Sequence, residues 1–547
     1  MRAARLVMAR RALLLAAILF MGLAVPAMAH DRPVIAAPAG QVRGTLQDGV
    51  RVFRGLPYAQ PPVGALRWRP PQAPAPWSGV RDAADFGAAC MQPASPFSTH
   101  AAVSEDCLFL NIWTPQQARG APVLVWIHGG SLVSGSGAEA VYDGARLARQ
   151  GVIVVSINYR LGALGWMAHP ALSAESAEHV SGNYGLMDQV QALRWVRDNI
   201  GAFGGDPRRV TIAGQSAGAL SVLYLMAAPE ARGLFDGAIS QSGYMIAMPE
   251  LRDGHFTDWP DAESLGAALA DRLGAPDLAA LRALPAQDIV SGAAGGGYFP
   301  LGTIDGAWLP RQLVDVFDRG EQARVPLLTG YNAGEIRSLP ILLPPAPEDA
   351  DAYVHEIRTR YGDLADAFLA LYPASDIRES MMATTRDAMY GWTAERLART
   401  QRAAGAPAFL YLFDHGYPAA DEAGFHAFHG AELPYVFGTS GSLPAWWPAI
   451  PDTASERRLS DAILKYWVAF VRDGRPQAHG EPSWPLYDSD RAYMAFEAAP
   501  EPRTGPPNGY ALNEAVVCRR RADGRQAWHW NVGVIAPHLP PPASACD

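Results

Sequence analysis

The chain has little of what several classes of protein depend on. Its 547 residues include a single lysine, Lys465, and only 18% are charged, with a formal net charge of −9. Because a net-acidic surface repels phosphate backbones, this composition argues against nucleic acid as a partner. After residue 29, no apolar run approaches the roughly 20 residues that a membrane-spanning helix needs. The 49% of hydrophobic residues suffices instead for a large buried core.

The first 29 residues differ from the rest of the sequence. Arginines precede the apolar run 12–25, and Ala27-Met28-Ala29 supplies a small-x-small cleavage site. This order is typical of a secretory signal peptide, and the apolar stretch is too short to span a bilayer comfortably. We therefore expect residues 1–29 to be a signal peptide and residues 30–547 to form a single domain. The mature protein is expected to be secreted or periplasmic.

Only four cysteines are present, and they fit an exported protein because disulfides persist outside the cytoplasm. Three pairings are possible. The most economical pairing joins neighbours in sequence, Cys90 with Cys107 and Cys518 with Cys546. Closing the loop 90–107 would stabilise the fold by about 3 kcal/mol in a chain-entropy account. Free thiols in one of the two pairs are the alternative.

Apolar, β-branched segments alternate with helical patterns along the mature chain. Six segments end at glycine or polar residues, as buried parallel strands do: 122–130, 151–160, 209–214, 237–243, 325–332 and 408–415. Helical patterns lie between and after them, including 185–205 and the amphipathic repeat 459–470. An antiparallel hairpin is expected near the N-terminus, with its turn at Asp48-Gly49. The alternation predicts an α/β fold with a large, mostly parallel sheet flanked by helices and a small antiparallel N-terminal portion.

The segment TIAGQSAGAL, residues 211–220, places a serine between a predicted strand and a predicted helix. Ser216 is flanked two residues away by Gly214 and Gly218. A serine at such a junction is exposed on a sharp turn, and the close backbone around it tolerates little beyond glycine. The following helix would direct its positive N-terminal end toward the serine oxygen. An ordinary flexible turn is the alternative, but the flanking strand and helix favour a nucleophile.

A nucleophilic serine needs a base and a site that stabilises the oxyanion. In enzymes with this turn the chain order is serine, acid, histidine. Composition does not choose among the seven candidate histidines, His355, His415, His426, His429, His479, His529 and His538. The glycines of WIHGGSLVSGSG, residues 126–137, would let backbone N–H groups approach a substrate closely. A dinucleotide-binding loop is excluded there because no complete G-x-G-x-x-G is present.

Taken together, the motifs resemble the type-B carboxylesterases, the α/β-hydrolase family that includes the cholinesterases. The likeness extends from about residue 33 to at least residue 500. It is carried by FRGLPYAQPPVGALRW, EDCLFLNIWTP, VWIHGG, INYRLGALG, GNYGLMDQVQALRWVRDNIGAFGGDPRRVTIAGQSAG, AISQSG and HGAELPYVFG. The resemblance implies the α/β-hydrolase fold. It also implies hydrolysis of a small-molecule carboxylic ester through a covalent acyl-enzyme, with no metal or cofactor.

The resemblance also assigns roles to individual residues. Ser216 matches the family nucleophile, and His429, in AFHGAELPYVF, matches its general base. Glu335, in GYNAGE, falls where the family keeps its acid, although Gly334 and Ile336 replace the usual aspartate and glycine around it. Ser242, in SQSG, matches a serine near the acid and base.

Backbone donors for the oxyanion are implied by the same likeness. The N–H groups of Gly130, Ser131 and Ala217 match the family's oxyanion hole, and Cys90 and Cys107 match its first disulfide. The sequence also departs from the family in the oxyanion loop and beside the nucleophile. Ser131 replaces the third glycine of the loop, Leu132 replaces the usual aromatic residue, and Gln215 replaces the commoner glutamate. No tryptophan lies between the two cysteines, which disfavours choline esters because cation–π contact would be lost.

Three other functions compete with this interpretation. A catalytically silent binding or adhesion protein on the same fold is one, but such relatives commonly lack the serine or the histidine. A Ser-Lys acyl enzyme needs lysine three residues after the serine, where this chain has Ala219. Metal-dependent hydrolysis could use His426 and His429, whose spacing suits one helical face, but no H-E-x-x-H motif supports it. Ester hydrolysis by a Ser-His-Glu triad is therefore the favoured hypothesis.

Overall fold

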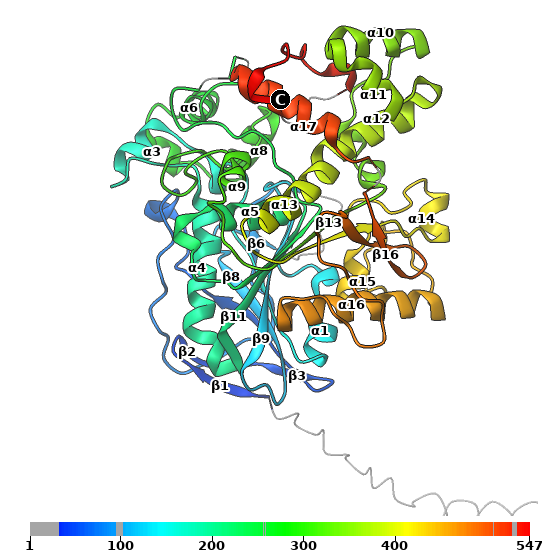
Figure 1. Ribbon diagram of the computed structural model, residues 1–547. Helices are drawn as coiled ribbons and strands as arrows, with labels where there is room; N and C mark the ends of the chain where they lie inside the picture. The colour runs from blue at the N-terminus through cyan, green and yellow to red at the C-terminus, as the bar shows by residue number, and fades with distance from the viewer. Residues whose placement is uncertain are drawn as a thin grey trace, which may run out of the picture.

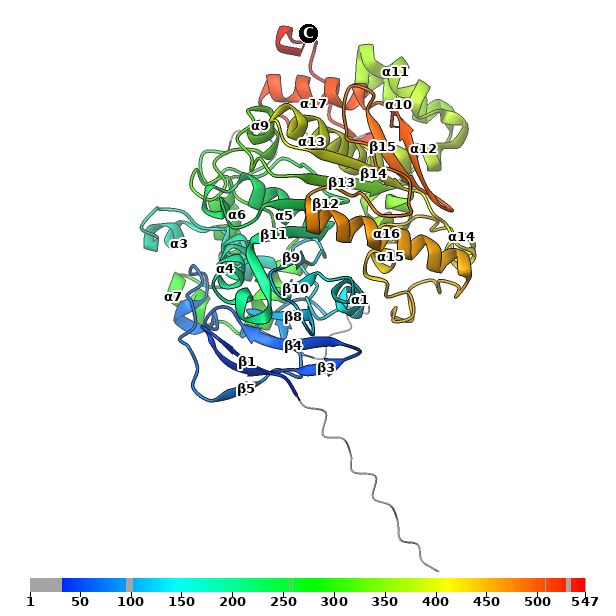
Figure 2. The ribbon, with the colours of Figure 1, turned by 60° about the horizontal axis from the view of Figure 1, so that its bottom comes forward.

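A mixed sheet of 11 strands crosses the molecule. The structure is a computed structural model, and it describes residues 32–94, 102–254, 256–257, 259–506, 508–527 and 533–546. The predicted signal peptide and His529 lie outside the described residues. The strands are β3 (Thr45–Gln47), β4 (Val50–Pro57), β8 (Phe109–Pro115), β9 (Ala121–Ile127), β10 (Ile153–Ile157), β11 (Gly205–Gln215), β12 (Gly237–Gln241), β13 (Leu327–Asn332), β14 (Ala408–Phe413), β15 (Ala492–Phe496) and β16 (Pro500–Thr504). Their spatial order is β16-β15-β14-β13-β12-β11-β9-β10-β8-β4-β3. Figure 1 shows the sheet inside the molecule, and Figure 2 shows the order from β15 to β3.

The central strands of this sheet are parallel, and both edges are antiparallel. Every neighbouring pair from β10 through β9, β11, β12, β13 and β14 to β15 is parallel. All six strands expected from apolar runs form this parallel centre. The expected hairpin is β3–β4, with Gln47 opposite Val50 and positive φ at Asp48 and Gly49. The prediction of a mostly parallel sheet with an antiparallel N-terminal portion is confirmed.

Helices cover both faces of the sheet (Figure 2). One face carries α4 (Tyr184–Asn199), α5 (Ala217–Ala227), α9 (Leu313–Asp318) and α13 (Trp392–Ala403). The other face carries α1 (Ala145–Arg149), α15 (Leu433–Phe437) and α16 (Ala454–Asp473). Along β9 the side chains alternate between the two cores, with Val125 in the first and Leu124 and Trp126 in the second. Each such fully buried aliphatic side chain stabilises the fold by about 1.5–3 kcal/mol, so both faces fix the sheet.

Two segments of the C-terminal half, 350–386 and 511–523, form a separate layer beside the sheet. Helices α10 (Ala350–Tyr361), α11 (Ala365–Leu371), α12 (Ile377–Arg386) and α17 (Ala511–Asp523) share an apolar cluster of their own and lie together in Figure 1. The remaining helices are α2 (Gly162–Trp166), α3 (Pro170–Glu175), α6 (Ala262–Arg272), α7 (Leu278–Ala283), α8 (Ala286–Gly295) and α14 (Pro418–Glu422). Small sheets are formed by β1 (Val34–Ala37), β2 (Gly40–Arg43) and β5 (Val80–Asp82), and by β6 (Ala89–Cys90) with β7 (Val103–Ser104).

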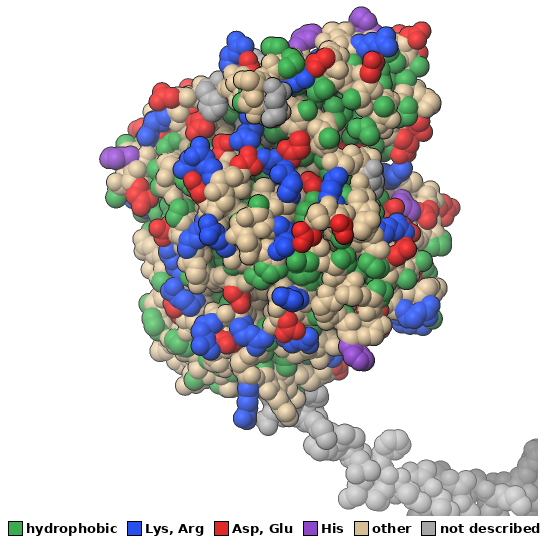
Figure 3. All heavy atoms as spheres, in the orientation of Figure 1, with side chains coloured by type: hydrophobic (Ala, Val, Ile, Leu, Met, Phe, Trp, Pro, Cys, Tyr) green, Lys and Arg blue, Asp and Glu red, His purple; other side chains and the backbone are tan. Residues whose placement is uncertain are grey.

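Acidic and basic side chains are interspersed over the face of the molecule drawn in Figure 3. Several ion pairs are exposed on the surface, among them Arg197 with Asp198 and Arg457 with Asp452, and Lys465 pairs with Glu481 at 2.7 Å. Such exposed pairs contribute about 0–1 kcal/mol each, so they serve solubility more than stability. Within the described part of the chain, none of the helices combines the length and the apolar character needed to cross a bilayer.

Candidate active site

Ser216 occupies the turn between β11 and α5. Its backbone has φ 58° and ψ −125°, a conformation that costs energy for any residue with a Cβ. The turn is anchored because the Ser216 N–H donates to the carbonyl of Gln241, at the end of the neighbouring strand, at 2.9 Å. The sharp strand-to-helix turn expected from TIAGQSAGAL is therefore present at the carboxyl edge of the sheet.

The two glycines of this motif are required by backbone contacts. A Cβ built on Gly218 would lie 2.1 Å from the carbonyl oxygen of Ile127, at the end of β9. A Cβ on Gly214 would lie 2.4 Å from the carbonyl carbon of Gly218. Both distances are far below van der Waals contact, and backbone atoms cannot rotate away as a side chain can. The turn is therefore compact enough to exclude any larger residue at either position.

Glu335 and His429 reach each other from loops 94 residues apart. Glu335 begins the short helix η5 (Glu335–Ser338) after β13, and its side chain is fully buried. One carboxylate oxygen accepts the N–H of Asn332 at 2.8 Å, and the other is hydrogen-bonded to Nδ1 of His429. The two loops are also joined by the N–H of Gly334, which donates to the carbonyl of Ala427 at 2.9 Å. The expected acid and base are thus held in direct contact.

The second ring nitrogen of His429 lies beside the serine turn. Its Nε2 is 3.2 Å from Nε2 of Gln215, the residue immediately before Ser216. The structure therefore brings the histidine–glutamate pair to the serine turn. Other described histidines are engaged elsewhere, His415 with Glu456, His426 with Asp414 and Asp421, and His538 with the carbonyl of Thr359.

Electrostatics around His429 favour its protonated form. Burial lowers the pKa of His429, but the charge of Glu335, the hydrogen bond that Nδ1 donates to Glu335 and the charge of Glu432 together outweigh it. The net result is a pKa above the ordinary value of a histidine. An imidazole that can be protonated and deprotonated again can carry a proton between reacting groups. The pair is therefore suited to proton transfer at the serine turn.

A second buried carboxyl group, Glu432, was not expected from the sequence. Asn332 donates to it at 2.7 Å and Gln241 at 3.0 Å, while Asn332 also donates to the carbonyl of Phe428 at 2.8 Å. Burial, together with the charge of Glu335, raises the pKa of Glu432. Asn332 thus ties the acid loop to the histidine loop. The only signal in the sequence is the position of Glu432, three residues after His429.

The glycine loop after β9 contacts the serine turn. A Cβ built on Gly129 would lie 3.1 Å from Cβ of Ser216. Gly130, Ser131 and Leu132 all have positive φ, at 106°, 56° and 59°. The N–H groups of Gly130, Ser131 and Ala217 donate to no residue that the structure describes. Three amide donors are thus left available at the loop and at the first turn of α5.

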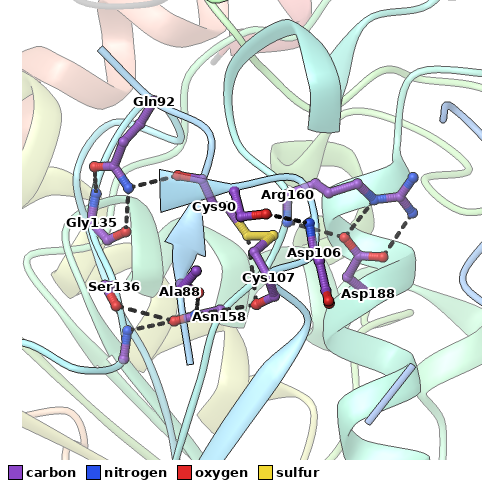
Figure 4. The surroundings of a disulfide bond; sticks show 12 residues. Ala88, Cys90, Gln92, Asp106, Cys107, Gly135, Ser136, Asn158, Arg160 and Asp188 are labelled. Carbon is purple, nitrogen blue, oxygen red and sulfur yellow. Dashed lines mark hydrogen bonds and ion pairs between the residues drawn. A yellow bond between two sulfur atoms is a disulfide. The ribbon is translucent and has the colours of Figure 1, made fainter. Parts of the chain in front are cut away.

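The disulfide Cys90–Cys107 supports this glycine loop (Figure 4). Asn158 bridges the two parts, because its Nδ2 donates to the carbonyl of Cys107 at 3.1 Å and its Oδ1 accepts the N–H of Gly137 at 2.9 Å. Gln92, two residues after Cys90, exchanges hydrogen bonds with the backbone of Gly135 at 2.9 and 3.0 Å. The bridge therefore fixes the loop that follows the oxyanion candidates.

Both disulfides of the sequence-local pairing are present in the structure. The second joins Cys518, on α17, to Cys546 near the C-terminus, with a Cα–Cα distance of 5.8 Å.

Ser242 follows β12 with φ 51°, and its N–H donates to the carbonyl of Gly330 at 2.8 Å. This residue therefore stands at the carboxyl edge of the sheet, next to Gln241, whose side chain reaches Glu432.

The parallel sheet, the strained serine between β11 and α5, and the acid that follows β13 define an α/β-hydrolase with an esterase-type site. Residues 31–510 match the carboxylesterase family, and the chain belongs to this family. It is a carboxylic ester hydrolase of the serine carboxylesterase class.

Several named relatives are similar over most of the chain. The fumonisin B1 esterase of Sphingopyxis macrogoltabida is 36% identical, covering 88% of each chain. The phenmedipham hydrolase of Pseudarthrobacter oxydans is 37% identical, covering 84% of this chain and 94% of the other. Among solved structures, a PNB esterase has a TM-score of 0.76 at 33% identity, covering 87% of this chain and 98% of its own. The relatives differ in the compounds that their names state, so the comparisons support ester hydrolysis and leave the substrate open.

Proposed function

We propose that the protein hydrolyses its ester through an acyl-enzyme, with Ser216 as nucleophile, His429 as general base and Glu335 as the acid that orients the imidazole. The observation that carries this proposal is the position of His429. Its Nδ1 is hydrogen-bonded to the buried carboxylate of Glu335, and its Nε2 contacts the side chain of Gln215, which precedes Ser216. Hydrogen bonding through Nδ1 leaves Nε2 as the nitrogen that accepts a proton.

The reaction proceeds in two halves. In the first, His429 takes the proton of Ser216 as Oγ bonds to the ester carbonyl carbon, and the protonated imidazole then gives that proton to the leaving alcohol as the C–O bond breaks. In the second, His429 takes a proton from water as the water oxygen attacks the acyl group. The proton then returns to Ser216 as the carboxylic acid is released. Glu335 stays ionised throughout and stabilises the imidazolium.

The oxyanion formed in each half is stabilised by backbone N–H groups of Gly130, Ser131 and Ala217. Support comes from their lack of another partner among the described residues and from the contact between Gly129 and Ser216. Donors that are held in place before the reaction need no reorganisation when negative charge develops, and each is worth about 10²–10³ in turnover. Ser242 would act behind the triad, where it fixes the strand end that accepts the Ser216 N–H.

The proposal is tested by Ser216→Ala and by trapping the nucleophile. The variant should lose nearly all hydrolysis of p-nitrophenyl butyrate, and a fluorophosphonate should add its mass to the Ser216 peptide of the parent alone. Gly233→Ala, at an open surface position, serves as the matched control, although its positive φ makes a small loss of stability expected. Equal rates for Ser216→Ala and the parent would eliminate the mechanism.

A catalytically silent binding protein is the second hypothesis, and the same assay separates it, because a silent protein has no rate to lose. Metal-dependent hydrolysis through His426 and His429 gains no support, since their rings bond to different carboxylates. Activity that resists a chelator is the expected result.

We further propose that residues 1–29 are removed on export and that residues 30–547 form one secreted or periplasmic domain, in keeping with the two disulfides.

A further inference from the structure

Two tyrosine rings form a wall beside His429. The ring of Tyr390 lies 5.3 Å from the imidazole of His429, centroid to centroid, and the ring of Tyr244 meets Tyr390 edge to face at 6.1 Å. Tyr244 follows β12 by three residues, and the last residue of β12, Gln241, accepts the N–H of Ser216. Tyr390 is therefore adjacent to the proposed base, and Tyr244 is in contact with Tyr390.

The Tyr390 ring is held in place by a local irregularity of the helix. It lies in the π-helix η9 (Asp387–Gly391), between α12 and α13. The buried carboxylate of Asp387 accepts hydrogen bonds from Arg386 at 2.7 Å, from Tyr372 at 3.0 Å and from Asn508. A π-turn costs energy relative to a regular helix and occurs often at functional sites. Here a network of side chains fixes the turn and with it the direction of Tyr390.

Neither tyrosine hydroxyl has a hydrogen-bond partner within the described part of the chain, although the rings of Tyr244 and Tyr390 are only 6% and 2% exposed. Each hydroxyl oxygen nevertheless keeps some accessible surface, so it borders open space. A buried phenol that only packed against its neighbours would lose free energy by leaving its O–H unpaired. Two such donors on contacting rings are suited to an acceptor that arrives with the substrate.

Charge around the pair selects the kind of acceptor. Burial and the charge of Glu335 raise the pKa of Tyr390, and burial raises the pKa of Tyr244, so both remain donors at neutral pH. The arginine nearest to Tyr390 in sequence, Arg386 at the end of α12, is already paired with Asp387 and donates to the carbonyl of Ala333. A substrate carboxylate beside Tyr390 would therefore meet the field of Glu335 and Glu432, and Arg386 would not be free to offset it. A neutral oxygen is the better match.

We propose that Tyr244 and Tyr390 together bind a neutral oxygen acceptor, an ether, hydroxyl or carbonyl group, carried by the ester within reach of its scissile bond. The protein would then prefer oxygenated esters to hydrocarbon esters of the same shape. This inference rests on the proposed role of His429 as the base beside Ser216. The acceptor can belong to the acyl group or to the alcohol, and the same two hydroxyls would serve either.

Isosteric ester pairs test the inference. On the acyl side, p-nitrophenyl methoxyacetate is compared with p-nitrophenyl butyrate, and on the alcohol side 2-methoxyethyl butyrate is compared with butyl butyrate. The ratio of kcat/KM within each pair, divided by the ratio of hydroxide-catalysed rates, is measured for the parent, Tyr244→Phe, Tyr390→Phe and the double variant. The acceptor belongs either to the acyl group or to the alcohol, so we expect an effect in one of the two pairs. In that pair the parent should favour the ether ester by about threefold to tenfold in corrected kcat/KM, and this ratio should be near one in the double variant.

The controls separate binding of the acceptor from a structural effect. Tyr466→Phe also deletes a buried hydroxyl, which donates to the carbonyl of Pro482 at 2.6 Å, and it should leave both ratios unchanged. An active parent whose ratios are the same in all tyrosine variants overturns the inference, as does a preference for the anionic mono-p-nitrophenyl succinate over the methoxyacetate. Failure of the proposed function looks different, because Ser216→Ala would then hydrolyse every ester as fast as the parent.

Discussion

Gln215→Glu should move the pH dependence of the enzyme upward. The Gln215 side chain is 5% exposed, and its Nε2 lies 3.2 Å from Nε2 of His429. A carboxylate at this position favours the imidazolium, and opposite charges within 4–6 Å shift a pKa by about 1–3 units. Because the new carboxylate must itself be desolvated, we expect the lower end of this range, a rise of about one unit or 1.4 kcal/mol.

The sign of the effect follows from the role of His429. The base must be neutral to accept the serine proton, so the acid limb of kcat/KM should move to higher pH by about one unit. At pH values on the acid limb, kcat/KM of the variant for p-nitrophenyl butyrate should be about tenfold lower than that of the parent. The two values should converge at alkaline pH. Gln215→Leu, neutral and of similar size, is the control and should leave the limb close to its place. An active Gln215→Glu enzyme whose limb is unmoved or lower would refute the placement of His429 beside residue 215.

Three further predictions follow from the same geometry. Gly218→Ala should lower the free energy of unfolding by about 1–3 kcal/mol, because its Cβ would meet the Ile127 carbonyl, and an unchanged Tm would contradict this. Glu335→Gln should reduce kcat by about 10⁴ with the fold intact by circular dichroism, whereas a loss below tenfold would remove Glu335 from the triad. The pKa of His426 is raised, since burial is outweighed by its bonds to two aspartates. The stability that protonated His426 adds to the fold is therefore fully present below the ordinary pKa of histidine and is lost as pH rises through the raised pKa. His426→Gln should for this reason lower Tm more at pH 5.5 than at pH 8.5.

The central sheet could be predicted because buried parallel strands are continuous apolar runs. The strands from β9 to β14 are apolar on both faces, since each packs against helices on both sides. The edge strand β16 has no such pattern. Its sequence, PEPRT, is mostly exposed and pairs only with β15. Prolines are tolerated at an edge, where an N–H needs no partner, so composition carries no signal for this strand.

The serine turn was predictable for a local reason, whereas the rest of the site was not. Gly214 and Gly218 flank Ser216 because backbone atoms a few residues away, and the end of β9, leave no room for a Cβ. The partner of His429 depends instead on two loops that meet only in the folded chain, and family resemblance was needed to choose it. Asn332, Glu432 and Tyr390 escaped notice because their contacts arise from tertiary packing alone.

The charge balance at His429 explains why a neutral residue suits position 215. When the imidazole is protonated during the reaction, its positive charge faces Glu335 directly and Glu432 at longer range. Glu432 already has a raised pKa, because burial and the charge of Glu335 both disfavour its ionisation. A third carboxylate beside the ring would compete with these two for the same positive charge and would have to be buried as well. An amide at 215 hydrogen-bonds to Nε2 of the resting imidazole but carries no charge that would hold its proton, so Nε2 can exchange this contact for the hydroxyl of Ser216.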